Sequence, residues 1–311
     1  MAGERLAAYG LRVAVDGLGL PGAVAAPAGA PADVAVRRAG RAEVLAAFSG
    51  PADPPRRATR RVDGAAVHVE RGAAGDLLLD WERGGVFRAD AHGATVLAHG
   101  EPDARWRRFL LDSVLVPVAL LHGAEALHAG TVEVGGAGIA VAAGQGGGKT
   151  TLLGALLARG ARLVADDVSV LRRDGGAFAV APAPPVLNVA RERPAGAAGP
   201  PELGEVLAEL DGELWVHARA VAPAPVALGL LVRLERGPDR TLRAARQPPS
   251  ARTALSHFLP SGPEPERRRA QFELAADLAA QVPLVVLEAP PDAPPGTLAE
   301  RVLAAARTGR P

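Results

Sequence analysis

The sequence predicts a mixed α/β protein in which a small β-rich N-terminal region precedes a larger domain of alternating strands and helices. Two observations predict this class. Short apolar runs separated by Gly and Pro clusters fill residues 1–102. After residue 103 the apolar spacing first becomes helical and then alternates between strand and helix. We therefore expect two domains, 1–102 and 103–311, the second led by a helix at 103–127.

Composition excludes several classes of function. The chain of 311 residues is 48% hydrophobic and 22% charged, as in soluble globular proteins. A net charge of +1 gives no basic field to attract nucleic acid or an anionic membrane, and the absence of cysteine excludes disulfides and thiolate chemistry. The best membrane candidate, 113–124, is too short to span a bilayer, and no apolar targeting segment opens the chain. We expect a cytoplasmic protein with no nucleic-acid or membrane partner.

The N-terminal region reads as an antiparallel meander. Its short alternating or apolar runs are predicted strands at 11–15, 66–70, 77–82 and 94–98. Its histidines (His68, His92 and His99) lack the spacing of metal ligands, so packing or surface roles are expected.

The segment 103–127 is predicted to be a buried helix. Its apolar residues recur at three- and four-residue steps, and Pro117 is expected to kink the helix or split it in two. Beyond it we predict strands at 131–134, 138–142, 162–165, 226–234 and 284–287, and helices at 150–158 and 265–281. The segments 181–201 and 245–265, rich in Pro, Ala and Gly, are expected to be loops or mobile lids.

Residues 143–150, Ala-Gly-Gln-Gly-Gly-Gly-Lys-Thr, match the P-loop pattern with Ala in the first place. Glycines let successive backbone N–H groups converge on a phosphate, and the following helix adds its positive N-terminal end. Lys149 would reach the β- and γ-phosphates, and the Thr150 hydroxyl would bind Mg²⁺. The candidate nucleotide-binding residues are Gly144, Gln145, Gly146, Gly147, Gly148, Lys149, Thr150 and Thr151.

Residue usage separates this motif from an ordinary glycine-rich turn, which is the alternative in a chain with 37 Gly. Of the 35 basic residues, Lys149 is the single lysine. A lysine retained where Arg serves everywhere else indicates a place that needs a compact ammonium group. The preceding apolar strand and the following helix are the context that the motif requires.

Asp166 and Asp167 end the next predicted strand, 16 and 17 residues after Thr150. A carboxylate there would bind Mg²⁺ or accept a proton from an attacking hydroxyl, and two adjacent carboxylates can divide those tasks. The alternative is a solvated acid pair in a turn. The separation of 16 and 17 residues from Thr150 favours the role in binding Mg²⁺ or accepting a proton over a solvated turn.

Residues Leu127 to Leu171 resemble the core of the HPr kinase/phosphorylase family. The resemblance is carried by His128, which lies 21 residues before Lys149, by the P-loop, and by the segment Arg-Gly-Ala-Arg-Leu-Val-Ala-Asp-Asp at 159–167. It implies a phosphoenolpyruvate-carboxykinase-like P-loop fold that uses ATP and Mg²⁺. It also implies that His128, Asp166 and Asp167 face the γ-phosphate, with one Asp as proton acceptor. Thr150 and Asp167 are the metal ligands that we predict on this basis.

Two departures from the family bear on the substrate. The family's loop with a metal-binding Glu has no match in 184–193, where Asn188 and Glu192 are the candidate replacements. Residues 1–100 do not resemble the family's regulatory domain. Both departures are typical of diverged HPr-kinase-like proteins found with genes for ribosomally made peptides, which the opening Tyr9 to Gly22 also resembles. The resemblance therefore implies a Ser hydroxyl of a peptide or protein, such as a precursor peptide, as phosphate acceptor.

Three functions stay open on the sequence. The first is this peptide or protein kinase, with arginines such as Arg191, Arg193 or those at 267–269 clamping phosphate or substrate. The second is a small-molecule kinase or phosphorylase on the same core. The third is a nucleotide-binding regulatory protein without catalysis. The sequence also leaves open the oligomeric state, a homo-oligomer included, and the direction of the reaction.

Overall fold

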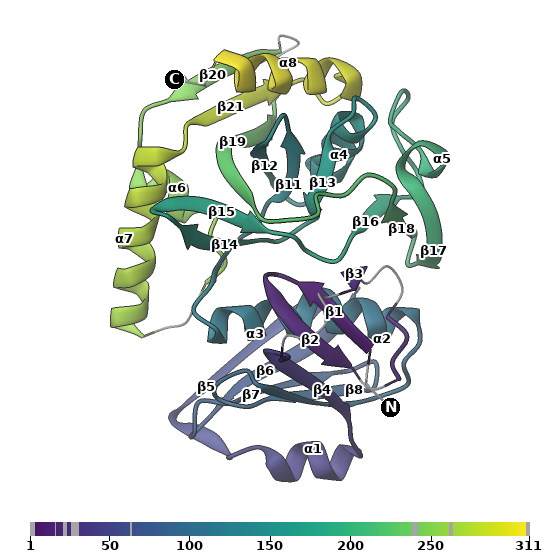
Figure 1. Ribbon diagram of the computed structural model, residues 1–311, viewed down its shortest axis with the longest axis vertical. Coiled ribbons are helices and arrows are strands. Elements are labelled where there is room, and N and C mark those ends of the chain that lie inside the picture. The colour runs from purple at the N-terminus through teal and green to yellow at the C-terminus, as the bar shows by residue number, and fades with distance from the viewer. Residues whose placement is uncertain are drawn as a thin grey trace. The chain divides into compact units, whose positions relative to one another are not determined.

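The computed structural model describes residues 4–15, 17–20, 24–25, 31–62, 64–237, 242–260 and 264–308. They belong to two compact units, Met1–Ala124 and Glu125–Pro311 (Figure 1). This boundary differs from the expected one at 102/103, since the helical segment after residue 103 belongs to the first unit. Within the described ranges, no helix is long and apolar enough to span a bilayer.

The first unit is built on one large sheet. Its elements are β1 Glu4–Ala8, β2 Leu11–Val15, β3 Val24–Ala25, β4 Val34–Arg38, α1 Arg41–Ala47, β5 Pro51–Val62, β6 Ala65–Gly72, β7 Leu77–Trp81, β8 Gly85–Ala89, β9 Thr95–His99, α2 Ala104–Phe109, the π-helical segment η1 Leu110–Val114, and α3 Leu115–Leu121. Among the described strands the order is β3-β1-β2-β4-β9-β8-β7-β6-β5. The predicted meander is confirmed for β5 to β9, which pair antiparallel in sequence order. It is wrong for β4, which pairs parallel with both β2 and β9 and so depends on crossovers that the sequence does not reveal.

Aromatic side chains hold the helical segment on this sheet. Trp81 of β7 stacks on Phe109 of α2 with ring centroids 4.5 Å apart, and Phe87 of β8 lies 5.3 Å from both Trp106 and Phe109. Asp103 caps α2 by accepting a hydrogen bond from the Trp106 backbone N–H at 2.8 Å. This burial of four aromatic rings explains why residues after 103 join the first unit.

The predicted helix 103–127 is interrupted, and its last residues form a strand. Pro117 lies in the first turn of α3, directly after η1, and its ring removes the N–H that would reach the Ser113 carbonyl. Arg60 of β5 donates to that carbonyl instead, at 3.1 Å. Gly123, with φ of 80°, ends the helical stretch, so residues 125–127 are free to pair as a strand of the second unit.

The second unit contains a mixed sheet covered by helices on both faces. Its elements are β10 Glu125–Leu127, β11 Gly130–Val134, β12 Ala137–Ala143, α4 Lys149–Leu157, β13 Arg162–Ala165, β14 Ser169–Asp174, β15 Ala177–Ala181, β16 Val186–Ala190, α5 Pro200–Leu203, β17 Gly204–Leu210, β18 Glu213–Ala218, β19 Val226–Arg236, β20 Arg243–Gln247, α6 Ala251–Leu255, α7 Pro265–Gln281, β21 Leu284–Ala289 and α8 Pro295–Thr308. The described strands run in the order β10-β14-β15-β19-β12-β11-β13, with β21 beside β19 and β20 beside β21. A separate sheet has the order β16-β18-β17.

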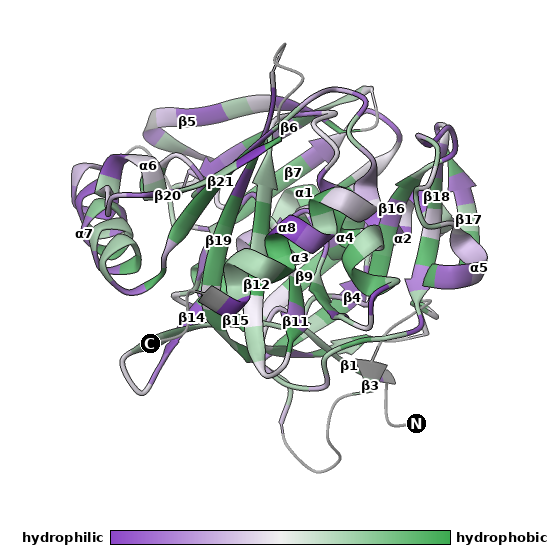
Figure 2. Ribbon diagram, turned by 90° about the horizontal axis from the view of Figure 1, so that it is seen from above, coloured by the Kyte–Doolittle hydropathy of each residue, from purple (hydrophilic) through white to green (hydrophobic). Residues whose placement is uncertain are grey.

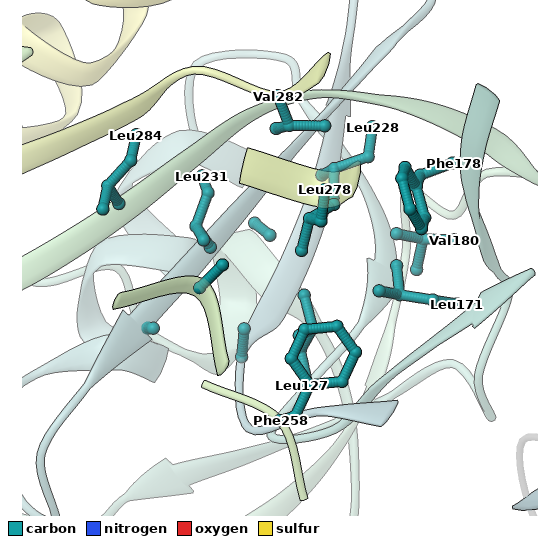
Figure 3. Close-up of a cluster of buried hydrophobic side chains, with 14 of the residues drawn as sticks. Leu127, Leu171, Phe178, Val180, Leu228, Leu231, Phe258, Leu278, Val282 and Leu284 are labelled. Carbon is teal, nitrogen blue, oxygen red and sulfur yellow. The ribbon is translucent and has the colours of Figure 1, made fainter. Parts of the chain in front are cut away.

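Two buried clusters lie on the two faces of this sheet. The cluster with α4 and α8 includes Val141 of β12 and Val232 of β19. The cluster with α6 and α7 includes Ala142 and Leu231, which are neighbours of those residues on the same strands, and is drawn in Figure 3. Figure 2 shows hydrophobic residues along β19, a central strand of this sheet. Residues of the two central strands therefore alternate between the clusters.

The expected loops at 181–201 and 245–265 are wrong in part. The first contains β16, which pairs with β18 more than 20 residues later, and the short helix α5. The second contains the end of β20 and the helix α6, which Ser250 caps by accepting from the Thr253 N–H. The sequence does not reveal these elements, because Pro and Gly clusters are typical of loops. In addition, the strands that pair with β16 and β20 lie far along the chain. In contrast, α7 has the predicted bounds, Pro265 to Gln281.

Candidate active site

The topology gathers the predicted site residues at one edge of the mixed sheet. β12 and β13 are both antiparallel to the strand between them, β11, so their carboxyl ends meet at this edge. The amino end of β11, which follows His128, lies there as well. The edge therefore carries the loop after β12, the Asp pair after β13 and His128, as the carboxyl edge of an α/β sheet commonly carries a ligand site.

The glycine loop, Gly144–Gly148, joins the buried strand β12 to α4. Gly146 and Gly148 have φ angles of 68° and 93°, a backbone region that side chains disfavour. The Gly147 N–H donates to the Gly144 carbonyl at 2.9 Å, and a Cβ on Gly147 would lie 2.9 Å from that same oxygen. The loop is thus a tight turn that only glycine fits at these positions, and it opens the nine-residue helix α4.

Lys149, the first residue of α4, points its ammonium group at Asp167. Its side chain is only 10% exposed, and Nζ donates to the Asp167 carboxylate and, at 3.2 Å, to the Asp167 carbonyl. The structure thus brings the single lysine and Asp167 together, a contact that we did not predict. The ion pair satisfies Lys149 in the absence of phosphate.

Asp166 is buried against the start of α4. It is 9% exposed and accepts hydrogen bonds from the Thr150 hydroxyl at 3.2 Å, the Asp167 N–H at 3.0 Å and the Asn188 N–H at 2.9 Å. Burial raises the pKa of Asp166 to about 6; the charge of Asp167 acts in the same direction, while Lys149 and the N–H donors oppose it. A pKa perturbed this far, beside a glycine loop, is typical of a functional carboxylate.

Asp167 adopts a conformation that differs from that of its neighbours. Its φ is 62°, in the left-handed region that few non-glycine residues occupy, and its side chain is 54% exposed. His128 Nδ1 lies 3.9 Å from Asp167 Oδ1. Burial lowers the pKa of His128; the charge of Lys149 lowers it further and that of Asp167 opposes both. The turn therefore presents Asp167 to solvent beside a histidine that favours its neutral form.

The Thr150 hydroxyl lies beside Asp166 and not beside Asp167, the residue that we predicted as its fellow metal ligand. We predicted Thr150 with Asp167, but the Thr150 hydroxyl contacts Asp166, while Asp167 contacts Lys149. A hydroxyl and a carboxylate are the hard ligands that Mg²⁺ takes alongside phosphate oxygens. Throughout the described ranges, no three His, Asp or Glu side chains cluster as a metal site.

Several other predicted residues lie elsewhere or contribute only their backbone. Asn188 bonds Asp166 through its N–H, while Gln145 and Glu192 are exposed and Thr151 is partly buried. The candidate arginine clamps have their own partners: Arg191 pairs with Glu209, Arg267 with Glu125 and Arg269 with Glu273, and Arg193 donates to the Ala190 carbonyl.

The sequence analysis missed Arg236, the last residue of β19. Its Nε donates to the Gly147 carbonyl at 3.2 Å and its Nη1 to the Pro290 carbonyl at 2.8 Å, and burial lowers its pKa. Arg236 thereby ties the glycine loop to the end of β21. No local pattern identifies it, because only the pairing of β19 with β12 brings it to the loop.

Among comparisons with known proteins, those with solved structures give a limited likeness. No family model matches the chain, and no curated protein matches it in sequence. The solved structure of the HPr(Ser) kinase/phosphatase from Coxiella burnetii is similar over 59% of this chain and 96% of that one, with 15% identity and a TM-score of 0.33. At these values the likeness is a structural resemblance only and carries no argument about activity.

Proposed function

We propose that this protein is a phosphotransferase that uses ATP and Mg²⁺ to phosphorylate a Ser-type hydroxyl of a peptide or protein. One observation carries the proposal. Lys149 and Thr150, the first two residues after the glycine loop, each contact one of two adjacent carboxylates at the end of β13. The P-loop domain would then be of the phosphoenolpyruvate-carboxykinase-like type that the resemblance of residues 127–171 implies.

The glycine loop and Lys149 would bind the phosphates of the nucleotide. Backbone N–H groups at the start of α4 carry partial positive charge that favours an anion. Lys149 now satisfies its ammonium group with Asp167, and a γ-phosphate offers it a doubly charged alternative. Nucleotide binding would therefore move the Lys149 ammonium group from the Asp167 carboxylate to the γ-phosphate. Asp167 would then be free to accept a proton.

Thr150 and Asp166 would hold the magnesium ion, which when bound neutralises charge on the β- and γ-phosphates. The hydrogen bonds from the Asp167 and Asn188 N–H groups orient the Asp166 carboxylate. The raised pKa of Asp166 fits this assignment, because a buried carboxylate without a cation is costly and a bound cation relieves that cost.

Asp167 would be the proton acceptor. Its carboxylate is exposed enough to meet an acceptor hydroxyl, and its backbone turn directs it to the side of His128. In the transfer, the acceptor oxygen forms a bond to the γ-phosphorus, the bond from that phosphorus to the β–γ bridging oxygen breaks, and the acceptor proton passes to Asp167. Positioning and charge stabilisation supply most of the catalysis in this type of reaction.

The decisive experiment measures magnesium-dependent transfer from ATP to Ser-containing peptides by mass spectrometry. We expect transfer by the wild-type chain and a loss of at least about 10³-fold in Lys149→Ala, as for removal of a main phosphate-binding charge. Arg243→Ala, an exposed cation on β20, is the control and should retain full activity.

Other results would redirect the assignment. Phosphorylation of small hydroxyl compounds but of no peptide would favour the small-molecule kinase or phosphorylase. ATP binding without transfer to any acceptor, unchanged in Asp167→Asn, would favour the regulatory protein and would rule out the proposed function.

A further inference from the structure

Arg236 continues the buried face of β19 beyond its last apolar residue. Leu230, Val232 and Leu234 alternate along the strand and all pack in the cluster with α4 and α8. Leu234 is aligned with Ala143, the last residue of β12, and Arg236 lies two residues further along. The same alternation therefore brings the Arg236 side chain to the α4 side of the sheet, at the edge where the glycine loop begins.

The guanidinium group of Arg236 bridges the glycine loop and the end of β21. Its Nε donates to the Gly147 carbonyl at 3.2 Å, and its Nη1 donates to the Pro290 carbonyl at 2.8 Å. A Cβ on Gly148 would lie 2.9 Å from Nη2, so the group lies against the peptide that joins Gly147 to Gly148. Because Arg236 is aligned with Ala289 in the sheet, the side of the bridge at β21 is fixed.

The hydrogen bond to the Gly147 carbonyl sets the direction of the next N–H group. In a trans peptide the carbonyl of one residue and the N–H of the next point in opposite directions. Since the oxygen of this peptide is turned toward Arg236, the Gly148 N–H points away from the guanidinium group. In the part of the chain that the structure describes, that N–H makes no hydrogen bond. It lies at the N-cap of α4, where an unpaired donor favours an anion.

The local sequence leaves this peptide free to rotate. Both residues that it joins are glycines, which restrict backbone rotation least. Among the described residues, Arg236 is the partner that the structure gives the Gly147 carbonyl. A rotated peptide would turn the negative end of that carbonyl toward a bound phosphate and would remove a donor from it. Arg236 is therefore the contact that keeps the N–H side of the peptide available.

We propose that Arg236 is a positioning residue that holds the Gly147–Gly148 peptide in the orientation that binds phosphate. This inference rests on the proposed function. Arg236 lies on the carbonyl side of the peptide, so it acts through the Gly148 N–H and does not itself contact the phosphate. The N–H serves the bound nucleotide before and during transfer alike. Loss of Arg236 should therefore raise KM for ATP and leave kcat nearly unchanged.

The test measures binding of two probes in the presence of Mg²⁺, a non-hydrolysable ATP analogue and inorganic pyrophosphate, by calorimetry. Arg236→Met keeps much of the apolar stem but removes the donors, and we expect it to bind both probes about tenfold more weakly. Amide ¹⁵N spectra should show the Gly148 signal shifting with pyrophosphate in the wild type and responding much less in Arg236→Met. Arg236→Lys, which keeps a donor for the Gly147 carbonyl, should recover part of the binding. Arg246→Met, a change at an exposed arginine on β20, is the control and should bind as the wild type does.

Failure of the positioning role and failure of the proposed function are distinguishable. If Arg236→Met binds both probes as the wild type does, or binds weakly while its Gly148 signal still responds normally, the positioning role is overturned and the proposed function stands. If the wild type binds pyrophosphate in an Arg236-dependent way but does not bind the ATP analogue, the positioning role stands and the proposed function fails. If the wild type binds neither probe, both are overturned.

Discussion

Each unit buries an aspartate, and the pKa values of the two aspartates are shifted in opposite directions. Asp76 in the first unit is 0% exposed. Burial by itself would raise its pKa, but the Ser49 hydroxyl at 2.5 Å, the Ser49 N–H at 3.1 Å and Arg88 Nε at 3.1 Å outweigh burial, and the pKa is lowered. Asp166 in the second unit is similarly buried, yet its pKa is raised to about 6.

The difference lies in what surrounds each carboxylate. Asp76 has a cation of its own in Arg88, so its charge is neutralised inside the fold. Asp166 accepts three hydrogen bonds but shares its nearest cation, Lys149, with Asp167. Asp76 is thus neutralised within the folded chain, whereas Asp166 is short of positive charge, as the proposed magnesium ligand would be. Four predictions test this contrast, from the largest expected effect to the smallest.

The largest effect should come from the proposed proton acceptor, Asp167. Asp167→Asn is expected to lower phosphoryl transfer by about 10²–10⁴-fold, because the proton acceptor is removed, while thermal stability changes little. Rate measurements on purified protein with a melting curve for each variant check this. The matched control is Asp174→Asn, an exposed acid at the end of β14, which should leave both quantities unchanged.

Removing the structural carboxylate should have the reverse outcome. Asp76→Asn is expected to reduce the free energy of unfolding by roughly 3–5 kcal/mol, because Arg88 loses its buried partner. Urea unfolding followed by tryptophan fluorescence measures it. Asp80→Asn, which breaks the exposed pair with Arg41, should cost no more than about 1 kcal/mol. Equal effects of the two changes would contradict the role assigned to Asp76.

The pH dependence of stability should also differ between the units. His257 has a folded pKa of about 4, below its ordinary value near 6.5, so the unfolded chain binds a proton first as pH falls. The contribution of His257 to the free energy of unfolding therefore declines as pH falls from 6.5 to 4, by at most about 3 kcal/mol. Hydrogen bonding by Arg12 lowers the pKa of Asp33 to about 2. Asp33 therefore stabilises the folded state above pH 3.8, and this stabilisation is lost as pH falls from 3.8 toward 2.

Unfolding titrations of His257→Gln and Asp33→Asn against the wild type separate these windows. The His257 variant should flatten the stability profile between pH 4 and 6.5. The Asp33 variant should change it below pH 4. A His257 variant with an unaltered slope would show that this imidazole is not buried in neutral form.

The smallest effect compares two glycines of similar conformation. Gly148 and Gly84 have φ angles of 93° and 92°, so an alanine at either should cost about 1–2 kcal/mol of stability. A Cβ at Gly148 would also lie 2.9 Å from Arg236 Nη2, whereas nothing lies within 4 Å of one at Gly84. We expect Gly148→Ala to weaken binding of an ATP analogue by about tenfold and Gly84→Ala to leave it unchanged, as calorimetry can measure.

The sequence alone predicted the glycine loop, its lysine, the following Asp pair and the bounds of α7. These features are local: residue types at fixed spacing determine the turn, the helix start and the strand end. The contact of Lys149 with Asp167 is not among these features, because it depends on the pairing of β12 and β13 with β11.

Only the tertiary structure decided the rest. Which Asp meets Thr150 depends on the left-handed turn at Asp167, and no spacing rule distinguishes two adjacent carboxylates. Arg236 comes to the glycine loop through the pairing of β19 with β12, and the chain after α6 comes to His128 through the pairing of residues 257–259 with β10. Such pairings join positions about 90 or 130 residues apart, and their energy comes from burial and hydrogen bonds that no short window of sequence contains.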